Sequence, residues 1–160
     1  MRQGDILLVN YFADPMGYLI KWATKSHYNH VAWALNEFVL IEAGGRGIKT
    51  THLSKYLNPR WFNIKLIRFT DLSKKQIKQI TQELVKQRNK LPYWKFFISY
   101  FLVALGITPL CKNCSNFLYF ALKNAGHGIS KCNKKFINPE DYNRYPKAKD
   151  VSDELLARTL

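Results

Sequence analysis

The first half of the chain alternates short apolar runs with polar turn residues, a pattern that is typical of an antiparallel sheet. The run Ile6-Leu7-Leu8-Val9 is continuously apolar and predicts a core strand. Two further runs are separated by Asn36-Glu37, which predicts the turn of a β-hairpin. A fourth run alternates apolar and polar residues over its first half, which predicts a strand with one exposed face. The predicted strands cover residues 5–9, 31–35, 38–42 and 62–69.

Helix signals dominate the second half of the chain. Ser73 and Gln76 have the spacing of a capping box, so a helix is predicted to begin at about Lys74 and to end before Pro92. Pro92 also suits the first turn of a mostly apolar helix that ends near Gly106. Shorter helical segments are predicted at residues 14–24, 53–57 and 138–141, and a loosely attached helical tail at 147–160.

A further helix places a thiol in its first turn. Asn113 is a favourable N-cap, and Gly126 is a favourable residue just beyond the helix end. The apolar stripe between them comprises Cys114, Phe117, Leu118, Ala121 and Ala125. The N–H groups and the positive dipole end at a helix N-terminus favour thiolate over thiol. Cys114 is therefore a candidate nucleophile, and a buried structural cysteine is the alternative interpretation.

The composition indicates one folded domain with a basic surface. A chain of 160 residues with 47% hydrophobic residues suits a single domain, which we assign to residues 1–146, followed by the tail 147–160. Lys and Arg number 25 against 11 Asp and Glu, a net charge of +14 that favours anionic surroundings. Because the lysines are spread along the chain, we expect a general basic surface and predict no specific nucleic-acid partner.

Cysteine usage and hydropathy bear on the cellular compartment. Three cysteines and the absence of a secretory signal at the start of the sequence predict reduced thiols and a cytoplasmic location. The longest apolar run, residues 96–110, is shorter than the roughly 20 residues of a spanning helix and contains Gly106 and Pro109. We expect this run to form a buried helix or a peripheral contact with a membrane surface.

Two ionisable residues at the ends of predicted strands would complete a catalytic site around Cys114. His30 stands at the start of one hairpin strand, and Glu42 stands at the end of the next. An imidazole can take a thiol proton and return it to a leaving group, while a carboxylate orients the imidazole. This triad is expected to need direct pairing of His30 with Glu42, through a three-residue loop at 35–37 or a bulge. A two-residue loop would instead leave an ordinary histidine and a solvated glutamate on opposite faces.

Another group of residues has the ligand types and spacing of a zinc finger. The set follows the pattern C-x2-C-x12-H-x4-C and consists of Cys111, Cys114, His127 and Cys132. Against this reading, the apolar residues that pack on the metal in such a finger are displaced, and no strand pair precedes the first cysteine. The function that accompanies this set is a non-catalytic, zinc-stabilised module that binds nucleic acid.

The order of four short motifs resembles a known family of hydrolases. These motifs are Gly4-Asp5-Ile6-Leu7-Leu8, Asn29-His30-Val31-Ala32-Trp33-Ala34-Leu35, Ile41-Glu42-Ala43 and Asn113-Cys114-Ser115-Asn116-Phe117. In this order the chain is similar to the circularly permuted branch of the NlpC-type papain-fold cysteine hydrolases, above all to the YiiX and YebB group. The likeness to lecithin retinol acyltransferase is more distant, since the third polar residue there is usually histidine, where this chain has Glu42.

The resemblance implies an α+β, permuted papain-like fold, in which an antiparallel sheet packs against the helix that carries the nucleophile. It also implies that Cys114 is the nucleophile, His30 the base and Glu42 the third polar residue. The backbone N–H of Cys114 is the expected oxyanion donor, and no cofactor is expected. Three further residues are expected either to line the site or to be ordinary neighbours of it: Ser115, Tyr28 and His27.

The predicted function is a thiol-dependent hydrolase of amidase or peptidase type that forms an acyl-enzyme on Cys114. The expected substrate is an amide or ester, such as peptidoglycan or another acyl-amide. The alternative is a lipid acyl hydrolase or acyltransferase of the same fold, with residues 96–110 as an apolar wall or membrane contact.

Overall fold

The computed structural model describes residues 1–13, 18, 21–22, 25–44, 47–88, 114–129 and 137–156. Several predictions lie outside these residues. They concern the helix predicted from Pro92 to Gly106, most of the helix predicted at 14–24, the N-cap at Asn113, and the cysteines Cys111 and Cys132.

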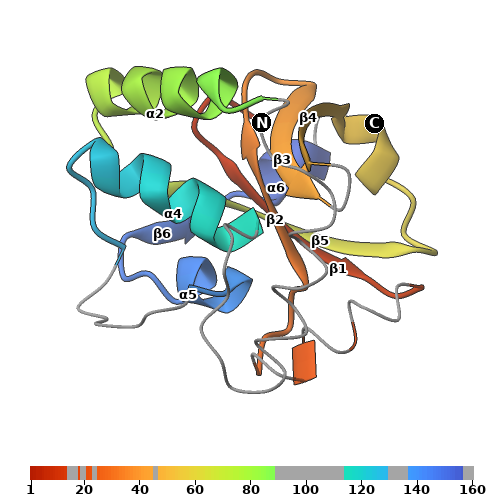
Figure 1. The fold of residues 1–160 in the computed structure, drawn as a ribbon. Helices are drawn as coiled ribbons and strands as arrows, with labels where there is room; N and C mark the ends of the chain where they lie inside the picture. The colour runs from red at the N-terminus through yellow and green to blue at the C-terminus, as the bar shows by residue number, and fades with distance from the viewer. Residues whose placement is uncertain are drawn as a thin grey trace.

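An antiparallel sheet of six strands forms the centre of the described structure (Figure 1). Its strand order is β4-β3-β2-β1-β5-β6. The strands are β1 (Ile6–Tyr11), β2 (His30–Ala34), β3 (Val39–Gly44), β4 (Gly47–His52), β5 (Phe62–Phe69) and β6 (Ala148–Asp150). The predicted α+β class and the four predicted strands are confirmed, whereas β4 and β6 were not predicted.

Helices cover both faces of this sheet. Helix α2 (Lys74–Lys86) and helix α4 (Cys114–Asn124) lie side by side on one face, and α5 (Pro139–Asn143) lies next to α4 (Figure 1). The 3-10 helix η1 (Leu53–Tyr56) and helix α6 (Asp153–Leu156) contribute buried residues to the core on the opposite face.

Burial on both faces explains the continuous apolar run of β1. Ile6 and Leu8 belong to the core that contains α2 and α4, while Leu7 and Val9 belong to the core that contains η1 and α6. Because successive side chains of a strand point to opposite faces, a strand covered on both sides needs an apolar residue at every position.

The predicted helix ends agree with the structure where they are described. At the start of α2, the Ser73 side chain accepts from the N–H of Gln76, and the Gln76 side chain accepts from the N–H of Ser73. Gly126 ends α4 with a φ of 75°, the left-handed conformation that glycine adopts without steric cost. Asn138 caps α5 in the same reciprocal way with Asp141.

Residues 148–156, part of the segment 147–160 that was expected to be a loosely attached tail, form the edge strand β6 and the packed helix α6. Strand β6 pairs with the end of β5, and Leu155 is buried in the core on the η1 side. An ion-pair network fixes α6 to this core. Arg68 of β5 donates two hydrogen bonds to the buried carboxylate of Asp5, at 2.6 and 2.9 Å, and two to Glu154, at 2.8 and 2.9 Å.

This network predicts a large loss of stability in Arg68→Gln. The substitution leaves the Asp5 carboxylate, which is only 1% exposed, without its cationic partner, and an uncompensated buried charge costs about 3 kcal/mol. The matched control is Arg2→Gln, since the Arg2 side chain is exposed and lies 3.6 Å from Glu154. Urea unfolding should show that the control lowers the free energy of unfolding by less than about 1 kcal/mol. Equal losses in both variants would contradict the assignment.

Candidate functional site

Cys114 lies at the first residue of α4 and is buried against the sheet. The rest of its helix packs by the predicted apolar stripe, and Phe117, Leu118 and Ala121 are all buried in the same core. The packing of α4 against β2 and β3 therefore holds the sulfur next to the two strands that carry His30 and Glu42.

The β2–β3 register differs from the expected one. Glu42 pairs with Ala32, and Leu40 pairs with Ala34, so the expected direct pairing of His30 with Glu42 is wrong. The reason is the loop, in which the Asn36 side chain accepts from the N–H groups of residues 38 and 39 and shifts the turn by one residue. His30 is two residues from Ala32, so His30 and Glu42 still share a face as diagonal neighbours.

The two side chains meet across this diagonal. His30 Nε2 lies 2.7 Å from Glu42 Oε2, and the His30 ring also forms a side-chain hydrogen bond with Cys114. Because Nε2 is engaged by Glu42, the ring nitrogen that remains for the sulfur is Nδ1. The imidazole therefore lies between the carboxylate and the thiol, as the predicted triad requires.

A divergence of β3 from β2 lets the sulfur reach the sheet. β2 pairs with β1 as far as His30, but its pairing with β3 ends at Ala32. Just beyond this point the backbone of Val31 hydrogen-bonds to Cys114. The site thus lies where two neighbouring strands separate, at the N-terminal end of the helix packed against them.

Glu42 is held by a shell of donors that the sequence did not reveal. Its side chain is 2% exposed. Thr51 Oγ1 of β4 donates to Oε1 at 2.6 Å, and the Tyr56 hydroxyl of η1 donates to Oε2. Two lysines add positive charge near Oε1, with Lys55 Nζ at 3.4 Å and Lys49 Nζ at 3.9 Å. All of these residues come from the stretch between β3 and β5.

The electrostatics of the site favour a charged thiolate–imidazolium pair. Burial alone would lower the pKa of His30, but its hydrogen bonds to Cys114 and Glu42 raise that pKa to about 10. Burial alone would raise the pKa of Cys114, yet the His30 hydrogen bond and positive charge, with the Val31 backbone, hold it below its ordinary value. The site therefore favours the thiolate over the thiol, and the thiolate is the nucleophilic form of cysteine.

The carboxylate remains ionised for the same reason. Burial would raise the pKa of Glu42, but the His30 hydrogen bond and charge, with the Thr51 and Tyr56 hydroxyls, hold it far below its usual range. Burial and the negative charge of Glu42 raise the pKa of Tyr56, so its hydroxyl stays protonated and donates. Glu42 thus provides a fixed negative charge behind the imidazolium.

The three residues expected near the site occupy different positions. Ser115 is buried with its Oγ 4.0 Å from the Cys114 sulfur, so it does lie beside the candidate nucleophile. Tyr28 is partly buried and packs against the core that contains Cys114. His27 is exposed, and its backbone N–H donates to Glu140 at 3.3 Å.

Helix α5 ties α4, the helix that carries Cys114, to the loop before His30. The Tyr142 hydroxyl donates to the Ser115 carbonyl at 2.5 Å, and the buried Glu140 accepts from the His27 backbone. The Asn116 side chain accepts from the N–H of Ile137 just before α5. One short helix therefore holds both the α4 and the β2 sides of the site in position.

The comparisons with known proteins bear on the fold. No protein-family model matches the chain, and no curated protein sequence matches it. Among the solved structures that are similar to the chain is that of YiiX from Escherichia coli O157:H7, which is described as a metalloprotein of DUF1105. The two share 17% sequence identity with a TM-score of 0.69, over 94% of this chain and 96% of that chain. The chain therefore has a YiiX-like fold, and its chemistry must be argued from its own site.

The described residues do not form a metal site. Two of the candidate zinc ligands, Cys114 and His127, lie at opposite ends of α4. This helix has 11 residues and is about 16 Å long, so one zinc ion cannot bind both side chains. The zinc-finger prediction is wrong for this pair. His127 is instead buried against the rings of Phe69 and Tyr145. At the Cys114 end of this helix, the two His30 ring nitrogens are engaged by Glu42 and by the sulfur. The side chains of Cys114, His30 and Glu42 therefore do not converge on one ion. Among the described residues no cluster of three or more metal-ligating side chains occurs.

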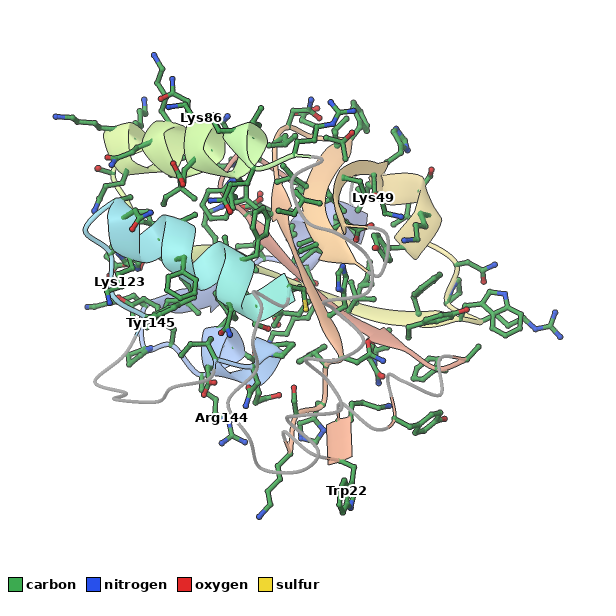
Figure 2. All side chains as sticks on the ribbon, viewed as in Figure 1. Trp22, Lys49, Lys86, Lys123, Arg144 and Tyr145 are labelled. Atoms are coloured by element: carbon green, nitrogen blue, oxygen red, sulfur yellow. The ribbon has the colours of Figure 1, made fainter. Side chains whose placement is uncertain are left out.

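Four labelled basic side chains of the described residues belong to different elements of the structure. Lys86, Lys123, Lys49 and Arg144 emerge on different sides of the ribbon (Figure 2). Within the described part of the chain, no helix has the length and hydropathy needed to cross a membrane.

The charged pair predicts an unusual pH profile for the alkylation of Cys114 by iodoacetamide. Between pH 8 and 6 the rate should change by less than about threefold, whereas a thiol with an ordinary pKa near 8.5 slows by roughly two orders of magnitude. His30→Ala should restore that steep dependence, since the imidazolium that lowers the thiol pKa is gone. The rate is measured by mass spectrometry of the peptide that contains Cys114.

The matched control for this experiment is His52→Asn. His52 is exposed and caps η1 through its side chain, a role that asparagine can also fill. Its profile should equal that of the unmodified protein. A steep profile in the unmodified protein would show that Cys114 is an ordinary buried thiol.

Proposed function

We propose that this protein is a thiol-dependent hydrolase that cleaves an amide or ester bond through an acyl-enzyme on Cys114. The observation that carries the proposal is the contact of one imidazole with both the thiol and a buried carboxylate. The YiiX-like fold and the motif order support the interpretation as a permuted papain-like domain.

The first half of the reaction follows from the charged resting state. The Cys114 thiolate attacks the substrate carbonyl carbon and forms a C–S bond, which moves an electron pair onto the carbonyl oxygen. Backbone N–H groups at the start of α4 are suited to stabilise this oxyanion. As the tetrahedral intermediate collapses, the His30 imidazolium gives its proton to the leaving nitrogen or oxygen, and the bond to that atom breaks.

The second half restores the thiolate. His30 is now neutral and takes a proton from water, which attacks the thioester carbonyl carbon. The C–S bond breaks, the acid is released, and the imidazolium–thiolate pair forms again. Throughout, Glu42 keeps the imidazole oriented and stabilises its positive form, and the donors Thr51 and Tyr56 keep Glu42 in place.

Glu42→Gln tests the role of the carboxylate. The amide is nearly the same size and its oxygen can still accept from one of the two hydroxyls, Thr51 or Tyr56, but it lacks the charge that stabilises the imidazolium. We expect turnover of a responsive substrate to fall by at least about 100-fold, because removing the orienting charge has that scale of effect in related triads. Thr51→Val should cause a smaller loss, since it removes one of the donors and leaves the charge. Equal activity of Glu42→Gln and the unmodified protein would contradict the proposed role.

The substrate class is tested by trapping the acyl-enzyme. The protein is incubated with acyl-amides, peptidoglycan fragments and phospholipids, and mass spectrometry then measures any mass added to Cys114. We propose an amide substrate of peptidase type, so an acyl adduct from an amide or peptidoglycan fragment is expected, and it should be absent in Cys114→Ala. A fatty-acyl adduct from phospholipid would contradict the peptidase-type substrate and would indicate a lipid acyl hydrolase or acyltransferase. No adduct with any of these substrates would count against acyl-enzyme chemistry.

A further inference from the structure

The solvent-facing side of α2 is strongly basic. Its exposed basic residues, together with one that follows the helix directly, are Lys74, Lys75, Lys78, Lys86 and Arg88. Within the described part of the chain, none of these five side chains forms an ion pair. The one acidic residue of the helix, Glu83, accepts a hydrogen bond from the Gln87 side chain at 2.8 Å. We call this group of five basic residues the α2 basic face.

These charges oppose the formation of the helix. Lys74 and Lys75 lie in the first turn, which contains no acidic residue, so they face the positive end of the helix dipole. Lys74 and Lys78 are four residues apart, a spacing at which like charges repel. The helix is stabilised instead by its capping box and by the burial of Ile80 and Leu84. The basic face is therefore not explained by folding, and a local feature that works against folding is typical of a functional surface.

The α2 basic face lies away from the proposed nucleophile. Helix α2 is at the outer edge of the molecule, and α4 lies between it and α5 (Figure 1). The side chains of Gln76 and Gln79 donate to the carbonyls of Ala125 and Asn124, at 3.3 and 3.2 Å. The start of α2 is thus fixed at the C-terminal end of α4, whereas Cys114 is at the other end.

The chemistry of the face favours one class of anion. Four of its five cations are lysines, which contact phosphates as point charges. Helix α2 has no aromatic residue, so it offers no ring on which an unpaired base could stack. Its apolar side is packed against the core, and Val85 is its one exposed large hydrophobic residue, so little of it could insert into a bilayer. A rigid polymer with a regular row of phosphates matches this surface best.

We propose that the α2 basic face binds duplex nucleic acid through its phosphates, without reading the sequence. A duplex carries one negative charge per roughly 1.7 Å of its axis, and the 13 residues of α2 span about 20 Å, so several phosphates can face the helix at once. The local excess of charge on this helix carries the proposal. It does not depend on the hydrolase reaction, because no residue of the face belongs to the proposed catalytic site.

Fluorescence anisotropy with a labelled duplex of about 20 base pairs tests the proposal. With roughly four phosphate contacts, the logarithm of the association constant should fall with the logarithm of the NaCl concentration with a slope of about −3.6. This slope corresponds to a loss of affinity of about 100-fold between roughly 50 and 200 mM NaCl. No saturable binding at the lower salt concentration, or an affinity that does not change with salt, would overturn the proposal.

A pair of triple variants separates the local charge from the net charge. The first, Lys75→Gln with Lys78→Gln and Lys86→Gln, should weaken binding at least tenfold at low salt and reduce the slope by about 2.7. The control removes three exposed charges from other parts of the molecule: Lys25→Gln, Arg60→Gln and Lys149→Gln. Its slope should stay within about 0.5 of the unmodified value. Equal losses in the two variants would show that only net charge matters and would overturn the assignment of the face.

The charge-reversal variant Lys74→Glu/Lys75→Glu tests the conflict between folding and binding. Acidic residues in the first turn interact favourably with the helix dipole, so the urea midpoint should rise, while duplex affinity should fall at least tenfold. A lower midpoint would contradict the claim that these lysines oppose the helix, and unchanged affinity would overturn the binding face. The pH profile of Cys114 alkylation should stay as in the unmodified protein, so this test and that of the hydrolase can fail separately.

Competition experiments test the class of partner. Unlabelled duplex, single-stranded DNA of the same length and phosphatidylserine vesicles are added at equal concentrations of negative charge. We expect the duplex to displace the labelled duplex most effectively. More effective displacement by the vesicles would assign the face to an anionic membrane, and more effective displacement by the single strand would assign it to unpaired nucleic acid. Either result would overturn the proposed partner.

Discussion

The buried negative charge of Glu42 is the constraint on which the rest of the site depends. Transferring a carboxylate out of water is costly unless hydrogen bonds and opposite charge offset the loss of hydration. Here Thr51, Tyr56 and the His30 ring donate to its two oxygens. Those partners come from three separate elements, so satisfying one carboxylate fixes the positions of β2, β4 and η1 relative to β3. The same charge stabilises the imidazolium, which in turn stabilises the Cys114 thiolate.

Local patterns predicted the elements of the site, and long-range contacts decided how they meet. The ends of α2 and α5 follow from their capping residues, and His30 and Glu42 were identifiable as ionisable residues at strand ends. The hairpin register was not identifiable, because it depends on the Asn36 side chain binding the backbone inside the loop. Tyr56 was missed for a related reason: nothing near it in the sequence indicates that its hydroxyl meets Glu42, 14 residues earlier. The available signal for β4 was weak: Ile48 and the β-branched pair Thr50 and Thr51 favour a strand, but the segment 47–52 does not alternate apolar and polar residues.

The fold places Cys114, the proposed nucleophile, and its two partners on elements that come from both halves of the chain. Strands β2 and β3 supply the imidazole and the carboxylate, and α4 brings the thiol to the point where those strands separate. Helix α5 then ties α4 to the loop before β2 through Tyr142 and Glu140. Since the similarity to YiiX extends over nearly the whole chain at 17% identity, it shows this architecture and leaves the chemistry to the residues themselves.

The central claim is that His30 is an imidazolium at neutral pH because it lies between a thiolate and a buried carboxylate. Nitrogen-15 NMR of the labelled histidine rings measures this directly, with His30→Gln used to assign the signal. The account predicts that both ring nitrogens of His30 are protonated at pH 8 and that the ring titrates with a pKa near 10. A neutral His30 ring at pH 8, with a pKa near the ordinary value of about 6.5, would contradict it.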